Sequence, residues 1–184
     1  MTDRNEHNEE YILGLIKQNV PSAMKLLYDR NIEYMSAVCS RYIADVNDQK
    51  DVLQESFIKI LTSIGKFQFR GEGSLRSWMI RITVNESLTF LRKNASQTII
   101  DFEENLPDTP DEPEIEGISD EVINEMILSL APGFRMVFNL YVFENKSHKE
   151  IAKLLGISES TSASQFLRAK TRLARMIKEY KKHI

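Results

Sequence analysis

Residues 158–175 combine short polar side chains with arginines behind them, which is the chemistry of a DNA-reading helix. Hydroxyl and amide groups can contact base edges in the major groove, and the cations that follow can neutralise phosphates. The amide of Gln165 can form two hydrogen bonds to adenine. We predict that this segment reads duplex DNA through Ser160, Thr161, Ser164, Gln165, Arg168 and Arg172.

A second segment, KFQFR at residues 66–70, alternates aromatic and cationic residues and suits an unpaired base. Phe67 and Phe69 offer stacking surfaces, and their cationic neighbours can neutralise phosphate. Asn85 has the donor and the acceptor needed to read a Watson–Crick edge. In the alternative interpretation, both phenylalanines belong to the core and Asn85 is an ordinary solvent-exposed helix residue. The residue types alone do not favour either interpretation over the other. We expect Trp78 on the inward face, as an anchor.

Helical spacing predicts the element that positions Asn85, from about Ser74 to Lys93. Its apolar stripe recurs at Ile80, Val84, Leu88 and Leu91. A polar stripe lies about 100° around the helix; it comprises Arg81, Asn85, Thr89 and Arg92.

The DNA-reading segment is preceded by the signals of a helix-turn-helix. Ser147 and Glu150 have the spacing of a capping box, which begins a short helix. Gly156 ends that helix, and Ser158 can cap a last helix that runs to about Lys181. Two helices joined by so short a turn are typical of a DNA-binding helix-turn-helix.

The remaining segments also read as helices, so we predict an all-α fold. Pro21 suits the first turn of a helix that runs to about Ile43, and Asp48 can cap the next one. Ser119 and Pro132 begin two more. No apolar run is long enough to cross a membrane, so we expect no membrane insertion.

The distribution of charge divides the chain. Residues 94–134 contain eleven acids and no lysine or arginine, whereas residues 135–184 have eleven lysines and arginines against four acids. Three prolines, Pro107, Pro110 and Pro113, also fall close together within the acidic stretch. We predict two helical domains, residues 1–95 and 119–184, joined by an acidic linker at 96–118.

Nothing in the sequence favours an enzyme. The three histidines are widely separated and form no metal-binding motif, and the single cysteine, Cys39, excludes an intrachain disulfide or a cysteine-based zinc site. No Walker A motif or nucleophile elbow is present. We therefore expect no catalytic residue, metal or cofactor. A purely structural helical adaptor is a further alternative, but it leaves the ordered polar and basic faces without a purpose.

These motifs together resemble those of the extracytoplasmic-function (group 4) sigma factors of bacterial RNA polymerase. DVLQESF (51–57), FRG (69–71) and WMIRITVN (78–85) resemble their second conserved region. LAPGFRMVFNL (130–140), SHKEIAKLLGIS (147–158) and FLRAK (166–170) resemble their fourth. The resemblance covers nearly the whole chain in the family's order, and it implies an alternative sigma factor that acts in the cytoplasm.

The resemblance also implies roles for residues. Asp51, Gln54 and Glu55 match the positions that dock on the coiled-coil clamp helices of the polymerase β′ subunit. The loop at 66–76 and the helix after it match the site that captures a flipped base of the −10 element and holds the adjoining phosphates. The −10 residues are Lys66, Phe69, Arg70, Arg76, Arg81, Asn85, Arg92 and Lys93. The linker matches a segment that threads the RNA exit path, and an anti-sigma factor is a common further partner.

Three positions depart from the family pattern. Ala163 and Gln165 stand where the recognition helix often has arginine, and Gly73 stands where a larger polar residue is common. The competing hypothesis is a helix-turn-helix repressor or activator that does not engage polymerase. Such a protein needs only the C-terminal domain and leaves Asp51, Gln54 and Glu55 unexplained.

Overall fold

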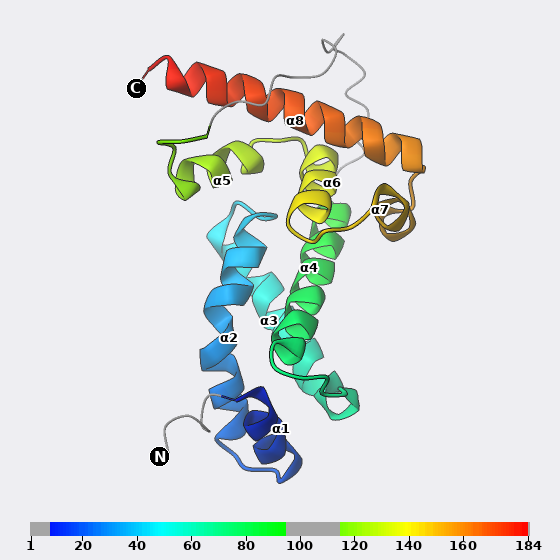
Figure 1. Ribbon diagram of the computed structural model, residues 1–184. Coiled ribbons are helices and arrows are strands. Elements are labelled where there is room, and N and C mark those ends of the chain that lie inside the picture. The colour runs from blue at the N-terminus through cyan, green and yellow to red at the C-terminus, as the bar shows by residue number, and fades with distance from the viewer. Residues whose placement is uncertain (1–7, 95–114, 184) are drawn as a thin grey trace. The chain divides into compact units, whose positions relative to one another are not determined.

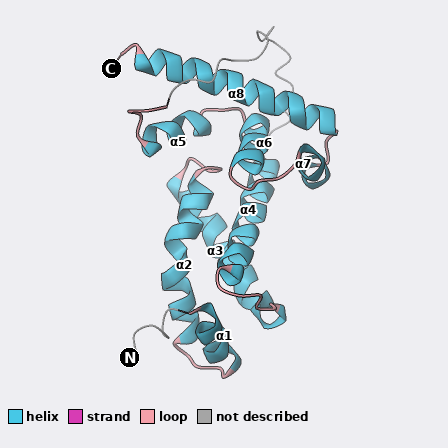
Figure 2. Ribbon diagram, viewed as in Figure 1, coloured by secondary structure: helices cyan, strands magenta, loops and turns pink. Residues whose placement is uncertain are grey.

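The structure is a computed structural model that describes residues 8–94 and 115–183. Every regular element in these two ranges is a helix (Figure 2), which confirms the predicted all-α fold. The chain divides into two compact units, Met1–Phe90 and Leu91–Ile184, and the division falls in the last turns of one helix. Most of the predicted acidic linker lies outside the described residues.

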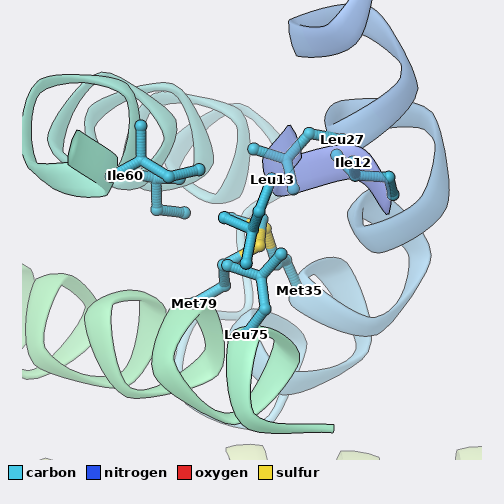
Figure 3. Packing of buried hydrophobic residues seen from close by; sticks show 8 residues of the cluster. Ile12, Leu13, Leu27, Met35, Ile60, Leu75 and Met79 are labelled. Carbon is cyan, nitrogen blue, oxygen red and sulfur yellow. The ribbon is translucent and has the colours of Figure 1, made fainter. Parts of the chain in front are cut away.

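The first unit is built from α1 (Glu9–Lys17), α2 (Ala23–Ser40), α3 (Val46–Ser63), the short 3-10 helix η1 (Ile64–Lys66) and α4 (Ser74–Asn94) (Figure 1). Apolar side chains from α1, α2, α3 and α4 point toward a common centre (Figure 3). That core comprises Ile12, Leu13, Leu27, Met35, Ile60, Ile64, Leu75 and Met79. Burial of such side chains is the main stabilising contribution to the unit.

The start of α3 differs from the prediction. Asp45, not Asp48, is the N-cap: its carboxylate accepts from the backbone N–H groups of Asn47 at 2.8 Å and Asp48 at 3.0 Å. Asp48 lies within the first turn, where its negative charge interacts favourably with the positive end of the helix dipole. The helix before it ends at Ser40, three residues before the predicted Ile43.

The second unit contains α5 (Asp120–Leu128), α6 (Pro132–Val142), α7 (His148–Leu155) and α8 (Glu159–Lys181) (Figure 1). The predicted starts are confirmed, with Ser119 as N-cap of α5 and Pro132 in the first turn of α6. A core joins α5, α6 and α8 through Ile127, Leu130, Phe134, Ala169 and Leu173. Helix α8 therefore has one face fixed against its neighbours and another left for solvent.

Candidate nucleic-acid and polymerase interface

Helix α3 presents an exposed polar face opposite its buried one. Asp51, Gln54 and Glu55 are exposed, whereas Val52 and Ile60 are buried in the core. Gln54 also lines a hollow of about 510 Å³ between α2 and α3, which is walled by aromatic and aliphatic side chains. The three predicted docking residues thus share one accessible surface beside a partly apolar hollow.

A hollow of about 480 Å³ opens between α3 and α4 and contains the predicted base reader, Asn85. Its walls combine an aromatic pair, two hydroxyls and two lysines with polar groups from α4. The lining residues are Lys59, Thr62, Ser63, Lys66, Phe67, Trp78, Ile82, Asn85 and Glu86. We call this the base hollow. It offers stacking surfaces together with donors and acceptors, the combination that an unpaired base requires.

A second hollow, of about 400 Å³, is more basic. It is lined by Lys66, Phe67, Gln68, Arg70, Ser74, Ser77, Trp78 and Arg81. We call it the basic hollow. Its three cations suit phosphate oxygens better than a base. The hydroxyls of Ser74 and Ser77 already donate to the carbonyl oxygens of Gly71 and Gly73. The loop and helix predicted to act as one site therefore form two adjoining hollows.

Phe67 and Trp78 separate the two hollows and line both of them. Their ring centroids are 5.1 Å apart, and both rings also pack on the core. Trp78 is only half-buried, so the expectation that it is merely an inward anchor was incomplete. The sequence spacing could have predicted that Trp78 lies beside Asn85, because residues 78, 81 and 85 share a helix face at i, i+3 and i+7.

Four of the predicted −10 residues, Phe69, Arg76, Arg92 and Lys93, line neither hollow. Phe69 is half-buried, packs against the core and lines neither hollow, so Phe67 is the phenylalanine at the hollows. The guanidinium of Arg76 lies 4.1 Å from the ring centroid of Tyr34 on α2 and lines neither hollow. Arg92 and Lys93 are exposed in the last turn of α4.

Two glutamates exchange hydrogen bonds to fix the loop before α4. The carboxylate of Glu9 accepts from the backbone N–H groups of Leu75 at 2.9 Å and Arg76 at 3.0 Å. In return, the carboxylate of Glu72 accepts from the backbone N–H of Glu9 at 3.0 Å. Each side chain satisfies donors that a helix start leaves unpaired, with negative charge at the positive end of a dipole. Helix α1 thereby positions the segment that carries both hollows.

The helix-turn-helix has the predicted caps. The Ser147 side chain accepts from the Glu150 N–H at 3.3 Å, and the Glu150 carboxylate accepts from the Ser147 N–H at 2.9 Å. Gly156 ends α7 in the left-handed conformation, with φ of 70°, and Ser158 caps α8 by accepting from Thr161 N–H at 2.9 Å. These bonds set the turn between α7 and α8 without distant residues.

Some predicted recognition residues lie on the accessible side of α8. Ser160 and Ser164 are exposed, and Thr161 and Arg168 are half-buried. These hydroxyls also hold the helix start, since the Oγ atoms of Ser158 and Ser160 are 2.8 Å apart and Ser164 donates to the carbonyl of Thr161 at 3.0 Å.

Gln165 does not lie on the accessible side of α8 as predicted, because its side chain is buried and faces α6. Only 8 % of the residue is exposed, and a Cβ placed on Gly133 would lie 3.5 Å from its Nε2 atom. Residues 165, 169 and 173 recur at i and i+4 on one face, and that face packs on the core. The predicted contact with adenine is therefore wrong for this arrangement. Arg172 is half-buried, with its guanidinium 5.3 Å from the Phe134 ring centroid.

His148 links three helices, a role that spacing did not reveal. Its ring stacks on Tyr141 of α6 with centroids 4.7 Å apart, and its Nδ1 lies 3.0 Å from the Oγ of buried Ser162 on α8. Phe166 packs against the same tyrosine at 4.3 Å. These contacts fix α7 against α6 and α8.

Three further observations concern metal binding, membrane spans and the single cysteine. In residues 8–94 and 115–183, no group of three or more His, Cys, Asp or Glu is arranged to hold a metal ion. Within the same ranges, no helix is both long and apolar enough to span a membrane. Burial raises the pKa of the Cys39 thiol to about 11, so this side chain is a poor nucleophile at neutral pH.

Two family models match the chain, one in each unit. The model described as Sigma-70 region 2 matches residues 27–97, and the model described as Sigma-70, region 4 matches residues 120–173. The first match includes α3, both hollows and Asn85, and the second includes the helix-turn-helix. The two matches together cover more than half of the chain, in the order that the motifs indicated.

Similar proteins are found in several bacteria. The ECF RNA polymerase sigma-E factor of Haemophilus influenzae is 29% identical over 176 residues, covering 88% of this chain and 91% of that protein. The sigma-E factor of Escherichia coli K12 is 27% identical over 175 residues, with 88% and 90% covered. RNA polymerase sigma factor YlaC of Bacillus subtilis is 28% identical over 130 residues, with 67% and 74% covered.

A solved structure has a similar fold. It is the sigma factor RpoE of Bartonella quintana, crystallised with the anti-sigma factor NepR. The TM-score is 0.52 at 18% identity, and the similarity covers 85% of this chain and 98% of that one.

Proposed function

Since the chain belongs to the sigma-70 family, in its extracytoplasmic-function group, we propose that its exposed polar surfaces divide promoter recognition among three sites. As an alternative sigma factor, it binds core RNA polymerase and directs promoter-specific initiation at −10 and −35 elements; such factors are not enzymes. The observation that carries the proposal is the base hollow, where Asn85 stands beside the Phe67–Trp78 pair.

We assign polymerase docking to the outer face of α3. Asp51, Gln54 and Glu55 are exposed together, and the partly apolar hollow beside Gln54 can receive side chains of the β′ clamp helices. Charged groups around an apolar centre are a common composition for a protein interface.

A pull-down with purified core polymerase tests this assignment. The wild-type chain should be retained, and Gln54→Ala combined with Glu55→Ala should reduce retention at least about tenfold, since central contacts of an interface each contribute more than about 1 kcal/mol. Gln18→Ala with Glu33→Ala is the matched control, because both residues are exposed elsewhere in the first unit. If wild type retained no polymerase, a stand-alone helix-turn-helix regulator would be the better explanation.

We assign −10 recognition to the two hollows. The base hollow would take an unpaired base extruded from the non-template strand, stacked on the aromatic pair and read by Asn85. Lys66, Arg70 and Arg81 in the basic hollow would hold adjoining phosphates, with Arg92 and Lys93 further along α4. We place Phe69 and Arg76 behind this surface as supports, because they pack on the core and on Tyr34.

We assign −35 recognition to the exposed face of α8. Its start would enter the major groove with Ser160, Thr161 and Ser164 near base edges, while Arg168 and Arg172 would reach phosphates. In salt titrations of −35 duplex binding, Arg168→Ala should flatten the slope of log affinity against log salt by about 0.9, one phosphate contact. Lys182→Ala, at an exposed position beyond the end of α8, should leave the slope unchanged. An unchanged slope in Arg168→Ala would place that arginine away from DNA.

The location and regulation of the protein follow from these partners. We propose that it acts in the cytoplasm, where bacterial polymerase and promoters are found, and that its units are connected by the acidic segment near residues 96–118. The structural neighbour was crystallised with an anti-sigma factor, which supports the proposal of such a partner for this chain. Co-purification of a second polypeptide that prevents polymerase binding would test it.

A further inference from the structure

An acidic side chain stands inside the base hollow, where a surface that binds DNA would be expected to be basic. Glu86 follows Asn85 on α4, and 14% of its side chain is exposed. Its Oε1 accepts from Lys59 Nζ of α3 at 2.7 Å. Lys59 is more open, with 54% of its side chain exposed.

The lysine offsets the cost of a carboxylate at this place. An unpaired negative charge beside phosphates would be repelled, and its partial burial would add a desolvation cost. The ion pair removes most of that repulsion while leaving carboxylate oxygens available, because an ionised carboxylate has about four acceptor sites. The one hydrogen bond shown for Glu86 among the described residues uses Oε1, so Oε2 keeps its acceptor capacity on a side chain that lines the hollow.

A carboxylate accepts hydrogen bonds and donates none, and this limits which bases it can favour. Cytosine, adenine and guanine each present an exocyclic amino group as a donor, whereas thymine has no amino group and presents two carbonyl oxygens. A thymine carbonyl facing Glu86 would meet another acceptor and lose its own hydrogen bond, which is costly in a confined site.

We propose that Glu86, held by Lys59, determines the base specificity of the base hollow: it favours an unpaired base with an exocyclic amino group, which is cytosine, adenine or guanine, and disfavours thymine, which has none. This inference rests on the proposed function and refines it. Asn85 has both a donor and an acceptor and can adapt to any base, so the discrimination against thymine comes from its neighbour.

The test is initiation by reconstituted holoenzyme, full-length chain with core polymerase, on a promoter library with all four bases at each −10 position. Wild type should deplete thymine at one non-template position about five- to tenfold relative to the bases with an amino group, the lower part of the range for a base contact. Glu86→Gln should start RNA but reduce that depletion to about twofold or less, since an amide can also donate to a carbonyl. Glu33→Gln removes the same charge at an exposed position on α2 and should keep the wild-type preference.

A second variant separates specificity from electrostatics. Lys59→Gln leaves Glu86 without its cation, so total initiation should fall at low salt while the ranking of bases is retained. Unchanged thymine depletion in an active Glu86→Gln holoenzyme would overturn this inference and leave the proposed function standing. Absence of RNA from every template with wild type would instead overturn the proposed function.

Discussion

The two units position their polar residues by different means. In the second unit, Ser147 and Glu150 cap α7, and Ser158 caps α8, with each bond reaching no more than three residues along the chain. In the first unit, the start of α4 depends on Glu9, which is 66 residues away from Leu75, and Glu72 returns a bond across 63 residues. The helix-turn-helix is thus defined locally, whereas the loop that carries the two hollows depends on α1.

This difference suits the two kinds of DNA. A duplex has a regular groove, and a rigid helix with local caps can meet it as a preformed shape. An extruded base needs a loop and two helices held at a fixed separation, which only contacts between distant segments can supply. The difference predicts that damage to α1 will affect −10 recognition and spare −35 recognition.

The largest expected effect follows from removing the core beneath the long-range cap. Leu75 is 1% exposed, and Leu75→Ala should destabilise the first unit by about 2–5 kcal/mol. Trp78 is the only tryptophan, so its fluorescence during urea unfolding reports on the first unit. Leu173→Ala in the core of the second unit is the control, and it should change the circular dichroism transition but not the fluorescence midpoint. Equal fluorescence shifts in both variants would refute independent units.

Removing the long-range cap itself should have a smaller effect on stability. Glu9→Ala leaves two N–H groups of α4 without their acceptor and should cost the first unit about 1–2 kcal/mol, as loss of a helix cap does. Holoenzyme with this variant should open promoters poorly while the −35 duplex is bound normally. Glu10→Ala, an exposed neighbour, should behave as wild type. Normal opening by Glu9→Ala would show that the loop does not need α1.

A local cap should have a local effect. Ser147→Ala removes the side chain that accepts from Glu150 N–H and should destabilise the second unit by about 1 kcal/mol. Circular dichroism should show an earlier transition with the Trp78 fluorescence midpoint unchanged. A matching shift of the fluorescence midpoint would mean that the caps of the two units are coupled.

The smallest expected effect is a dependence on acid. Hydrogen bonds from Ser147 lower the pKa of Glu150 below its ordinary value of 4.5. The unfolded chain therefore takes up this proton first, so the stabilisation is fully present above about pH 4.5 and is lost as pH falls through the lower folded pKa. Stability of the second unit should fall slightly in this window, and Glu150→Gln should lack that component. An identical acid dependence in Glu150→Gln would assign the effect to other carboxylates.

Contacts between residues close together in the sequence could be predicted, whereas contacts between distant residues could not. The caps at Ser147, Gly156 and Ser158 were predictable because each motif lies within a few residues. The bonds of Glu9 were not, because nothing in the local sequence relates it to α4. Gln165 was misjudged by its residue type where helical spacing was the better guide, because it lies on the buried face of α8. Trp78 packs against the core as expected of an anchor, and helical spacing also places it on the face of Asn85.

The most direct test of the central claim, that the base hollow captures an extruded −10 base, is permanganate footprinting of promoter DNA bound by holoenzyme. With wild type, thymines of the opened region should become reactive. With Asn85→Ala, that reactivity should fall at least about tenfold while gel-shift binding to the closed duplex changes by less than about threefold, because a contact made only by the unpaired base is lost. Equal permanganate reactivity in the two holoenzymes would contradict the account.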